Sequence, residues 1–211
     1  MLADPSAREG DWLVALTQDA GRGRQGRAWQ SATGNFYGST LVVLSAGDPS
    51  PTTLSLAAGL ALFDAVEAAV HGFALMLKWP NDLLLANDKL AGILLERSGE
   101  RIVAGFGVNL AVGPGLKDRI AASLRGSIGP TEFAPLLAGS FSRRLSQWRS
   151  GSESLQADWL ERAHAVGTPL SVHASADERI SGTFAGIEFD GALRLQTANG
   201  VQTVRAGDVE L

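Results

Sequence analysis

Gly21-Arg22-Gly23-Arg24-Gln25-Gly26-Arg27, the run GRGRQGR, places three arginines among three glycines. Glycine lets the backbone adopt positive φ and approach a ligand closely, and guanidinium groups match phosphate or carboxylate oxygens in bidentate pairs. The preceding residues 12–17, WLVALT, are apolar and rich in strand formers, so we expect a strand at the edge or end of a sheet. The run therefore predicts an anion-binding loop anchored on a strand. For any single arginine, the alternative is an exposed turn without a ligand.

The same run fits GxGxxG, the pattern of dinucleotide-binding sites. That pattern requires its third glycine to open a helix whose N-terminus faces a pyrophosphate. Residues 27–40, RAWQSATGNFYGST, show no apolar repeat of helical period and lead into the strand-like run 41–44. A dinucleotide fold is therefore disfavoured.

Composition narrows the class of protein further. The chain has 211 residues, 45% of them hydrophobic and 19% charged, as expected for an ordinary globular protein. The formal net charge of −4 provides no general basic field for nucleic acid, and the absence of cysteine removes disulfides and thiolate chemistry. The N-terminus lacks the pattern of a signal peptide, so a cytoplasmic location is expected.

Hydrophobic patterning predicts an α+β fold. Residues 53–70 form one apolar helix, interrupted by Asp64 and Glu67 and so too charged to span a bilayer, and further helices are expected over 131–149 and 153–165. Strands are expected over 73–79, 82–86, 89–96 and 101–110, in a mixed sheet covered by the helices. Short alternating runs follow at 168–173, 180–187, 192–197 and 201–204, typical of a small β-barrel. We therefore expect two domains, residues 1–166 and 167–211.

Two further clusters can carry chemistry. In Lys78-Trp79-Pro80-Asn81-Asp82 the proline stops helix and strand, which leaves a lysine and a carboxylate on a rigid turn close to Lys89. In residues 105–109, GFGVN, glycines would admit a ligand close to a strand end. The alternatives are a hairpin with solvated charges and glycines that serve only strand packing.

The order of these clusters resembles the biotin protein ligases, relatives of the lipoate ligases and class II aminoacyl-tRNA synthetases. The resemblance rests on QxAGRGRxGRxW at residues 18–29, GNFYGS at 34–39, KWPND at 78–82, KLAGIL at 89–94 and GFGVNL at 105–110. It implies a catalytic domain of class II synthetase type followed by an SH3-like barrel. It also implies that biotin and ATP form biotinyl-5′-AMP, with Mg²⁺ as counter-ion, and that a lysine of a biotin carboxyl carrier protein then takes the biotin.

The resemblance also implies roles for individual residues. Lys89, Arg24 and Asp82 would be catalytic: Lys89 would stabilise the reacting carboxylate and α-phosphate, Arg24 would close the loop over the adenylate, and Asp82 would either hold Mg²⁺ or assist the acceptor lysine. Biotin or the adenylate would be bound by Gln18, Gly21, Arg22, Gly23, Arg24, Lys89, Gly92, Gly105 and Gly107. ATP would be bound by Arg24, Arg27, Trp29, Asn81, Lys89 and Asn109, with Trp29 against the adenine.

Two departures from the family pattern bear on these expectations. The family usually carries a Ser-Thr-Asn segment upstream on the biotin side, and this chain begins roughly where the following helix would lie. The alternatives are a misassigned start, a truncation and a real divergence from the family. Gln25 stands where arginine is usual, and we expect a modest effect. A lipoate or octanoate ligase or transferase and a non-catalytic adenylate-binding module are the rival functions. No DNA or membrane partner is expected, and the oligomeric state stays open, with a homodimer among the alternatives.

Overall fold

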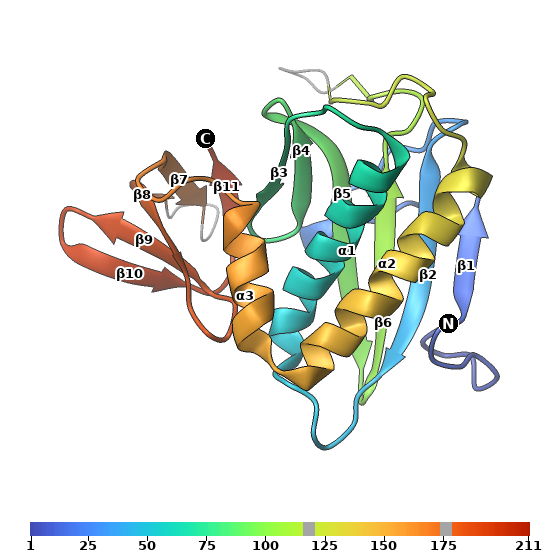
Figure 1. Ribbon diagram of the computed structural model, residues 1–211, viewed down its shortest axis with the longest axis horizontal. Coiled ribbons are helices and arrows are strands. Elements are labelled where there is room, and N and C mark those ends of the chain that lie inside the picture. The colour runs from blue at the N-terminus through green and yellow to red at the C-terminus, as the bar shows by residue number, and fades with distance from the viewer. Residues whose placement is uncertain (116–120, 174–178) are drawn as a thin grey trace.

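A six-stranded antiparallel sheet forms the centre of the larger part of the protein (Figure 1). The structure is a computed structural model, and it describes residues 1–115, 121–173 and 179–211. The strands follow the order β1-β2-β6-β5-β4-β3, with bounds β1 Trp12–Ala15, β2 Phe36–Val43, β3 Leu75–Lys78, β4 Asp82–Leu85, β5 Asp88–Ser98 and β6 Arg101–Val108.

The expected α+β class is confirmed, but the sheet is antiparallel at every pairing of these strands rather than mixed. Consecutive hairpins join β3, β4, β5 and β6, and hairpin connections give antiparallel neighbours. A helical crossover does connect β2 to β3, but it carries the chain to the far edge of the sheet. The two strands that it joins are therefore not neighbours, and no parallel pair forms between them.

Helix α1, Leu54–Ala69, is the core helix that the sequence predicts. It lies with α2, Pro130–Ser150, and α3, Ser152–Glu161, on one face of the sheet (Figure 1). Residues 51–69 are long and apolar enough to cross a membrane by length and composition, but 67% of that window is buried inside the protein. Its hydrophobicity is thus explained by core packing, because α1 contacts both the sheet and the other two helices.

An aromatic cluster fixes β1, the strand that delivers the arginine-rich loop. The rings of Trp12 and Phe106 stack with centroids 5.8 Å apart, and Phe141 of α2 meets Phe106 edge-on at 5.7 Å. Such pairs add roughly 0.5–1.5 kcal/mol beyond the area they bury. The loop therefore follows an edge strand that Trp12 fixes to the core.

The C-terminal part is a five-stranded antiparallel sheet in the order β10-β9-β8-β7-β11. Its strands are β7 Pro169–His173, β8 Arg179–Ile187, β9 Leu193–Thr197, β10 Gly200–Val204 and β11 Asp208–Glu210. The first four were expected from the sequence. Strand β11 was not, because it has three residues and only Val209 is buried, which leaves no alternating pattern to detect.

Hydrogen bonds hold this sheet against the larger part of the protein. Trp79 Nε1 donates to the carbonyl of Gly191 at 2.9 Å, and Gln156 Nε2 donates to the carbonyl of Ile187 at 2.8 Å. One of these contacts starts from the KWPND turn. The C-terminal sheet is therefore positioned relative to that turn. The expected boundary between two domains at residues 166 and 167 stays a prediction.

Candidate active site

The arginine-rich loop is a closed hairpin rather than a helix start. Trp29 N–H donates to the carbonyl of Gly21 at 2.9 Å, and Gly23 N–H donates to the carbonyl of Arg27 at 2.7 Å. A single 3₁₀ turn lies between them, with Gln25 and Gly26 at φ values of 55° and 72°. Glycine reaches such values at little cost, and this is the local role of Gly26. The dinucleotide alternative is excluded by this geometry.

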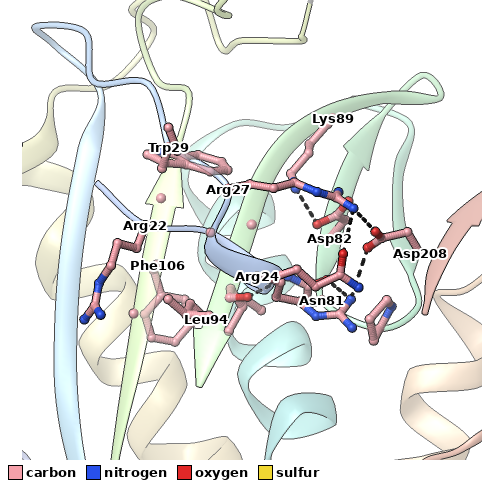
Figure 2. Close-up of a pocket in the computed structure, with 18 of the residues that line it drawn as sticks. Arg22, Arg24, Arg27, Trp29, Asn81, Asp82, Lys89, Leu94, Phe106 and Asp208 are labelled. Atoms are coloured by element: carbon pink, nitrogen blue, oxygen red, sulfur yellow. Dashed lines mark hydrogen bonds and ion pairs between the residues drawn. The ribbon is translucent and has the colours of Figure 1, made fainter. Parts of the chain in front are cut away.

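The three arginines of the loop leave it in two directions (Figure 2). Arg22 points toward β5, where its guanidinium lies 2.9 Å from the Glu96 carboxylate. Arg24 and Arg27 point the other way, to Asp208 at the start of β11: Arg24 Nη1 lies 3.6 Å from this carboxylate, and Arg27 pairs with it closely. The loop thus has side-chain anchors on two different sheets.

Arg24 is the most enclosed of the three guanidinium groups. Its Nη1 donates to Asn81 Oδ1 at 3.3 Å and to the carbonyl of Gly207 at 3.2 Å. Burial lowers the pKa of Arg24 from its ordinary value, and the carboxylates of Asp208 and Asp82 act in the opposite direction. Since the ordinary value is far above neutrality, the group is a fixed cation held by an amide oxygen and a main-chain carbonyl.

The KWPND turn places a carboxylate between two lysines. The Trp79–Pro80 peptide bond is cis, and Asn81 is fixed by a hydrogen bond from its Nδ2 to the carbonyl of Ile93 at 2.7 Å. Asp82 Oδ1 lies 2.6 Å from Lys89 Nζ, and Asp82 Oδ2 lies 3.9 Å from Lys78 Nζ. The expected proximity of Lys89 to this turn is confirmed.

Trp29 covers the glycines that were expected to admit a ligand. A Cβ on Gly107 would come within 2.5 Å of the indole, and one on Gly92 would come within 3.1 Å of the indole and 3.2 Å of Lys89. Lys89 Nζ lies 5.4 Å from the centroid of the Trp29 ring, within the range of a cation–π contact. In this structure the Trp29 indole therefore packs against Gly92 and Gly107, and the ligand contacts expected for these two glycines stay predictions.

The side-chain amide of Asn109 is hydrogen-bonded to other segments of the chain. It is buried, and its Nδ2 donates to the carbonyl of Ala122 at 3.0 Å. Its Oδ1 accepts a long bond, 3.5 Å, from Asn35, whose own Oδ1 accepts from the N–H groups of Ala111 and Val112. The ATP contact expected for Asn109 stays a prediction, and the contacts seen here are those of a side chain that fixes the segment after β6.

One cavity of about 1050 Å³ collects these groups. Of the residues singled out from the sequence, it is lined by Gln18, Arg22, Gly23, Arg24, Arg27, Trp29, Asn81, Asp82, Lys89, Gly92, Gly105, Gly107 and Asn109. Gly21 is the exception. A Cβ there would lie 2.6 Å from the Trp29 carbonyl, so Gly21 serves the main-chain closure of the loop.

The cavity wall also includes residues that sequence reasoning missed. Asp208, Glu210 and His173 come from the C-terminal sheet, and Glu96 comes from β5. No sequence motif marks them, because their contribution depends on how the second sheet packs against the first. The result is a cavity with five cations and four carboxylates: Arg22, Arg24, Arg27, Lys78 and Lys89 against Asp82, Glu96, Asp208 and Glu210.

Known proteins share this sequence and architecture. Residues 5–112 match the model of the biotin/lipoate A/B protein ligase family, and residues 172–211 match that of the biotin protein ligase C-terminal domain. The biotin-(acetyl-CoA-carboxylase) ligase of Paracoccus denitrificans is 39% identical over 94% of this chain and 89% of its own length. This chain belongs to the biotin protein ligases.

Two further comparisons agree with that membership. The ligase of the same name from Mycobacterium tuberculosis is 36% identical over 95% of this chain and 79% of its own length. The biotin protein ligase of Aquifex aeolicus, solved in complex with biotin and ATP, superposes with a TM-score of 0.84 over 97% of this chain and 89% of that one. At 24% identity, the latter likeness supports the ligase fold alone.

The ligase cavity does not resemble a resident metal site. Asp82 is already neutralised by the ammonium groups of Lys89 and Lys78. Within the described parts of the chain there is no group of three or more histidine, aspartate or glutamate side chains that could hold a metal ion. Asp82, Lys89 and Lys78 therefore fit a structural ion pair better than a dedicated magnesium site, because such a site needs several oxygen ligands.

Proposed function

We propose that this ligase activates biotin with ATP and transfers it to a lysine of a biotin carboxyl carrier protein. The observation that carries the proposal is the convergence of Arg24, Lys89 and Arg27 on one cavity that is large enough for an acyl-adenylate. Both reacting groups, a carboxylate and a triphosphate, are anions. Cations fixed in advance by protein contacts lower the free energy of charge that builds up in the transition state.

In the first step a biotin carboxylate oxygen attacks the α-phosphorus of ATP. A new P–O bond forms, the bond to the β-phosphate breaks, and pyrophosphate leaves with the electron pair. Lys89 is suited to stabilise the charge on the carboxylate and the α-phosphate, because its ammonium lies between the Trp29 ring and Asp82. Asp82 keeps this ammonium in place before the substrates arrive.

In the second step the neutral amine of the acceptor lysine attacks the carbonyl carbon of the mixed anhydride. The amide C–N bond forms, the C–O bond to AMP breaks, and the amine gives up a proton. Asp82 lies beside Lys89, where the reacting carboxylate would be held. The Asp82 side chain is therefore our candidate for assisting the acceptor lysine of the carrier protein. Arg24 and its loop would exclude water, which otherwise hydrolyses the adenylate.

We assign magnesium to ATP rather than to the protein. Because Asp82 is paired with two lysines, the metal would be held mainly by triphosphate oxygens, and no step here depends on a protein-bound ion. The other expected roles stay predictions. A cytoplasmic location and a homodimer are among them, and so are all the individual ligand contacts. Biotin or adenylate contacts are predicted for Gln18, Gly21, Arg22, Gly23, Arg24, Lys89, Gly92, Gly105 and Gly107, and ATP contacts for Arg24, Arg27, Trp29, Asn81, Lys89 and Asn109.

Mass spectrometry of a carrier domain tests the proposal. After incubation with the ligase, ATP, Mg²⁺ and biotin, one lysine should gain the mass of a biotinyl group, and pyrophosphate should be released. Lipoate and octanoate serve as competing substrates in parallel reactions. Modification by either of them, without modification by biotin, would contradict the assignment.

A further inference from the structure

The KWPND turn is attached to the C-terminal sheet through the side chain of Trp79. This side chain is buried, with 5% of the residue exposed, and its indole Nε1 donates to the main-chain carbonyl of Gly191 at 2.9 Å. An indole has a single hydrogen-bonding group, its N–H donor, and this group needs a partner when it is buried. The Gly191 carbonyl therefore satisfies the only polar group of the Trp79 side chain.

The acceptor lies in the turn between β8 and β9, and this turn is itself fixed by hydrogen bonds. Within the turn, Gly191 N–H donates to the Glu188 carbonyl at 2.9 Å, and Ala192 N–H donates to Asp190 Oδ1 at 3.1 Å. From outside it, Thr52 Oγ1 donates to the Asp190 carbonyl at 2.8 Å, just before α1 begins. The carbonyl that Trp79 contacts is therefore held in place by both parts of the protein.

On its other side, Trp79 leads directly into the charged residues of the cavity. Asn81 is tied to β5 twice: Ile93 N–H donates to the Asn81 carbonyl at 2.9 Å, and Asn81 Nδ2 donates to the Ile93 carbonyl at 2.7 Å. Asp82 follows and lies 2.6 Å from Lys89 Nζ. The turn thus has one support on β5 and another on the C-terminal sheet, and a displacement of Trp79 would move Asp82 away from Lys89.

We propose that Trp79 is a positioning residue for adenylate formation. Its bond to the Gly191 carbonyl fixes the KWPND turn, and this turn keeps the Asp82 carboxylate beside Lys89. Small displacements of reacting groups slow an enzyme strongly, so the C-terminal sheet contributes to the rate through a main-chain carbonyl. The effect of Trp79 on the reaction rests on the proposed function, whereas its effect on the turn does not.

Trp79→Phe tests the proposal, because it removes the N–H donor and keeps an aromatic ring. In a first turnover with saturating biotin, ATP and Mg²⁺, the rate constant of pyrophosphate release should fall about three- to tenfold. The ATP concentration that gives half of the maximal rate should change less than about twofold, because a positioning residue does not bind the nucleotide. A smaller folded fraction lowers the amplitude of this turnover and leaves its rate constant unchanged, so the two effects are separable.

Gln156→Met is the matched control. Gln156 Nε2 donates to the carbonyl of Ile187 at 2.8 Å, so this variant also removes one hydrogen bond between the C-terminal sheet and the larger part of the protein. That bond starts from α3 and not from the KWPND turn, so the rate constant should stay near the parent value. Equal slowing of both variants, or a parent-like rate constant for Trp79→Phe, would overturn the proposal. So would weaker ATP binding without a slower rate, which would make Trp79 a substrate contact.

Thr52→Val covers the case that Trp79→Phe folds poorly. Thr52 is exposed, and the variant removes only its bond to the Asp190 carbonyl, next to the acceptor of Trp79. The loosened turn should slow the same rate constant about two- to threefold. An unchanged rate constant in this variant would contradict the proposal.

Amide hydrogen exchange gives a readout that needs no catalysis. The Ile93 N–H bonds to the Asn81 carbonyl, so its exchange rate reports on the KWPND turn. It should rise about three- to tenfold in Trp79→Phe and stay near the parent rate in Gln156→Met, and equal rates in the two variants would contradict the hold on the turn. If the parent makes no biotinyl-AMP, the proposed function fails, but the exchange of Ile93 still decides whether Trp79 fixes the turn.

Discussion

Replacing Gly107 by alanine tests whether the Trp29 indole must pack directly against the backbone of this glycine. An added Cβ would lie 2.5–2.7 Å from three indole atoms, about 1 Å inside ordinary van der Waals contact, so the ring would have to move. Overpacking of this kind costs about 1–3 kcal/mol in unfolding free energy. A displaced ring beside Lys89 should also weaken ATP binding about tenfold, the equivalent of about 1.4 kcal/mol.

Gly105→Ala is the matched control on the same strand. A Cβ there would meet Ser39 Oγ at 3.5 Å and the Leu94 carbonyl at 3.6 Å, which are ordinary contacts. Denaturant unfolding should therefore show a change within about 0.5 kcal/mol for this variant. The KM for ATP in a pyrophosphate-release assay should stay near the parent value.

A double-mutant cycle with Trp29→Leu completes the test. If the clash with the indole is the cause, the cost of Gly107→Ala should fall by more than half in the Trp29→Leu background, because the two side chains are in direct contact. An equal cost in both backgrounds, or no cost in either, would refute the reasoning and leave the conformation of Trp29 unrelated to Gly107.

Three further predictions follow from the same site and its surroundings. Lys89→Ala should slow adenylate formation about a hundredfold or more while the thermal melt changes little, and an unchanged pyrophosphate-release rate would contradict its role. Arg24→Gly should release biotinyl-AMP about ten- to a hundredfold faster, seen as streptavidin-detected labelling of a bystander protein; near-parent adenylate synthesis without added labelling would argue against retention. Burial, followed by the charge of Lys78, lowers the pKa of His164. The unfolded chain therefore binds the proton more readily, and stability should fall as the pH drops from about 7 to about 5. His164→Gln should flatten that slope in denaturant titrations at several pH values, whereas the exposed His71→Gln should not.

Packing adds contacts at the site that the sequence did not predict. Trp29, far from the GFGVN run in sequence, fills the space beside Gly107. Arg22 pairs with Glu96 on β5. Each contact depends on a partner that is distant along the chain, and a local sequence pattern cannot identify such a partner. The ligand contacts expected for Gly107 and Arg22 stay predictions.

The sequence by itself determined the ligase family, the core helix, the four consecutive hairpin strands β3 to β6 and the positions of the charged loop and the KWPND turn. Hydrophobic periodicity and turn-forming residues act over a few residues, so the sequence alone reveals them. The tertiary structure alone decided that the sheet is antiparallel, that β11 exists, and that Asp208 meets Arg24 and Arg27 across more than 180 positions of sequence. The contact of Asp208 with the arginines depends on how two sheets pack together, because this packing, and no local propensity, brings the carboxylate to the arginines.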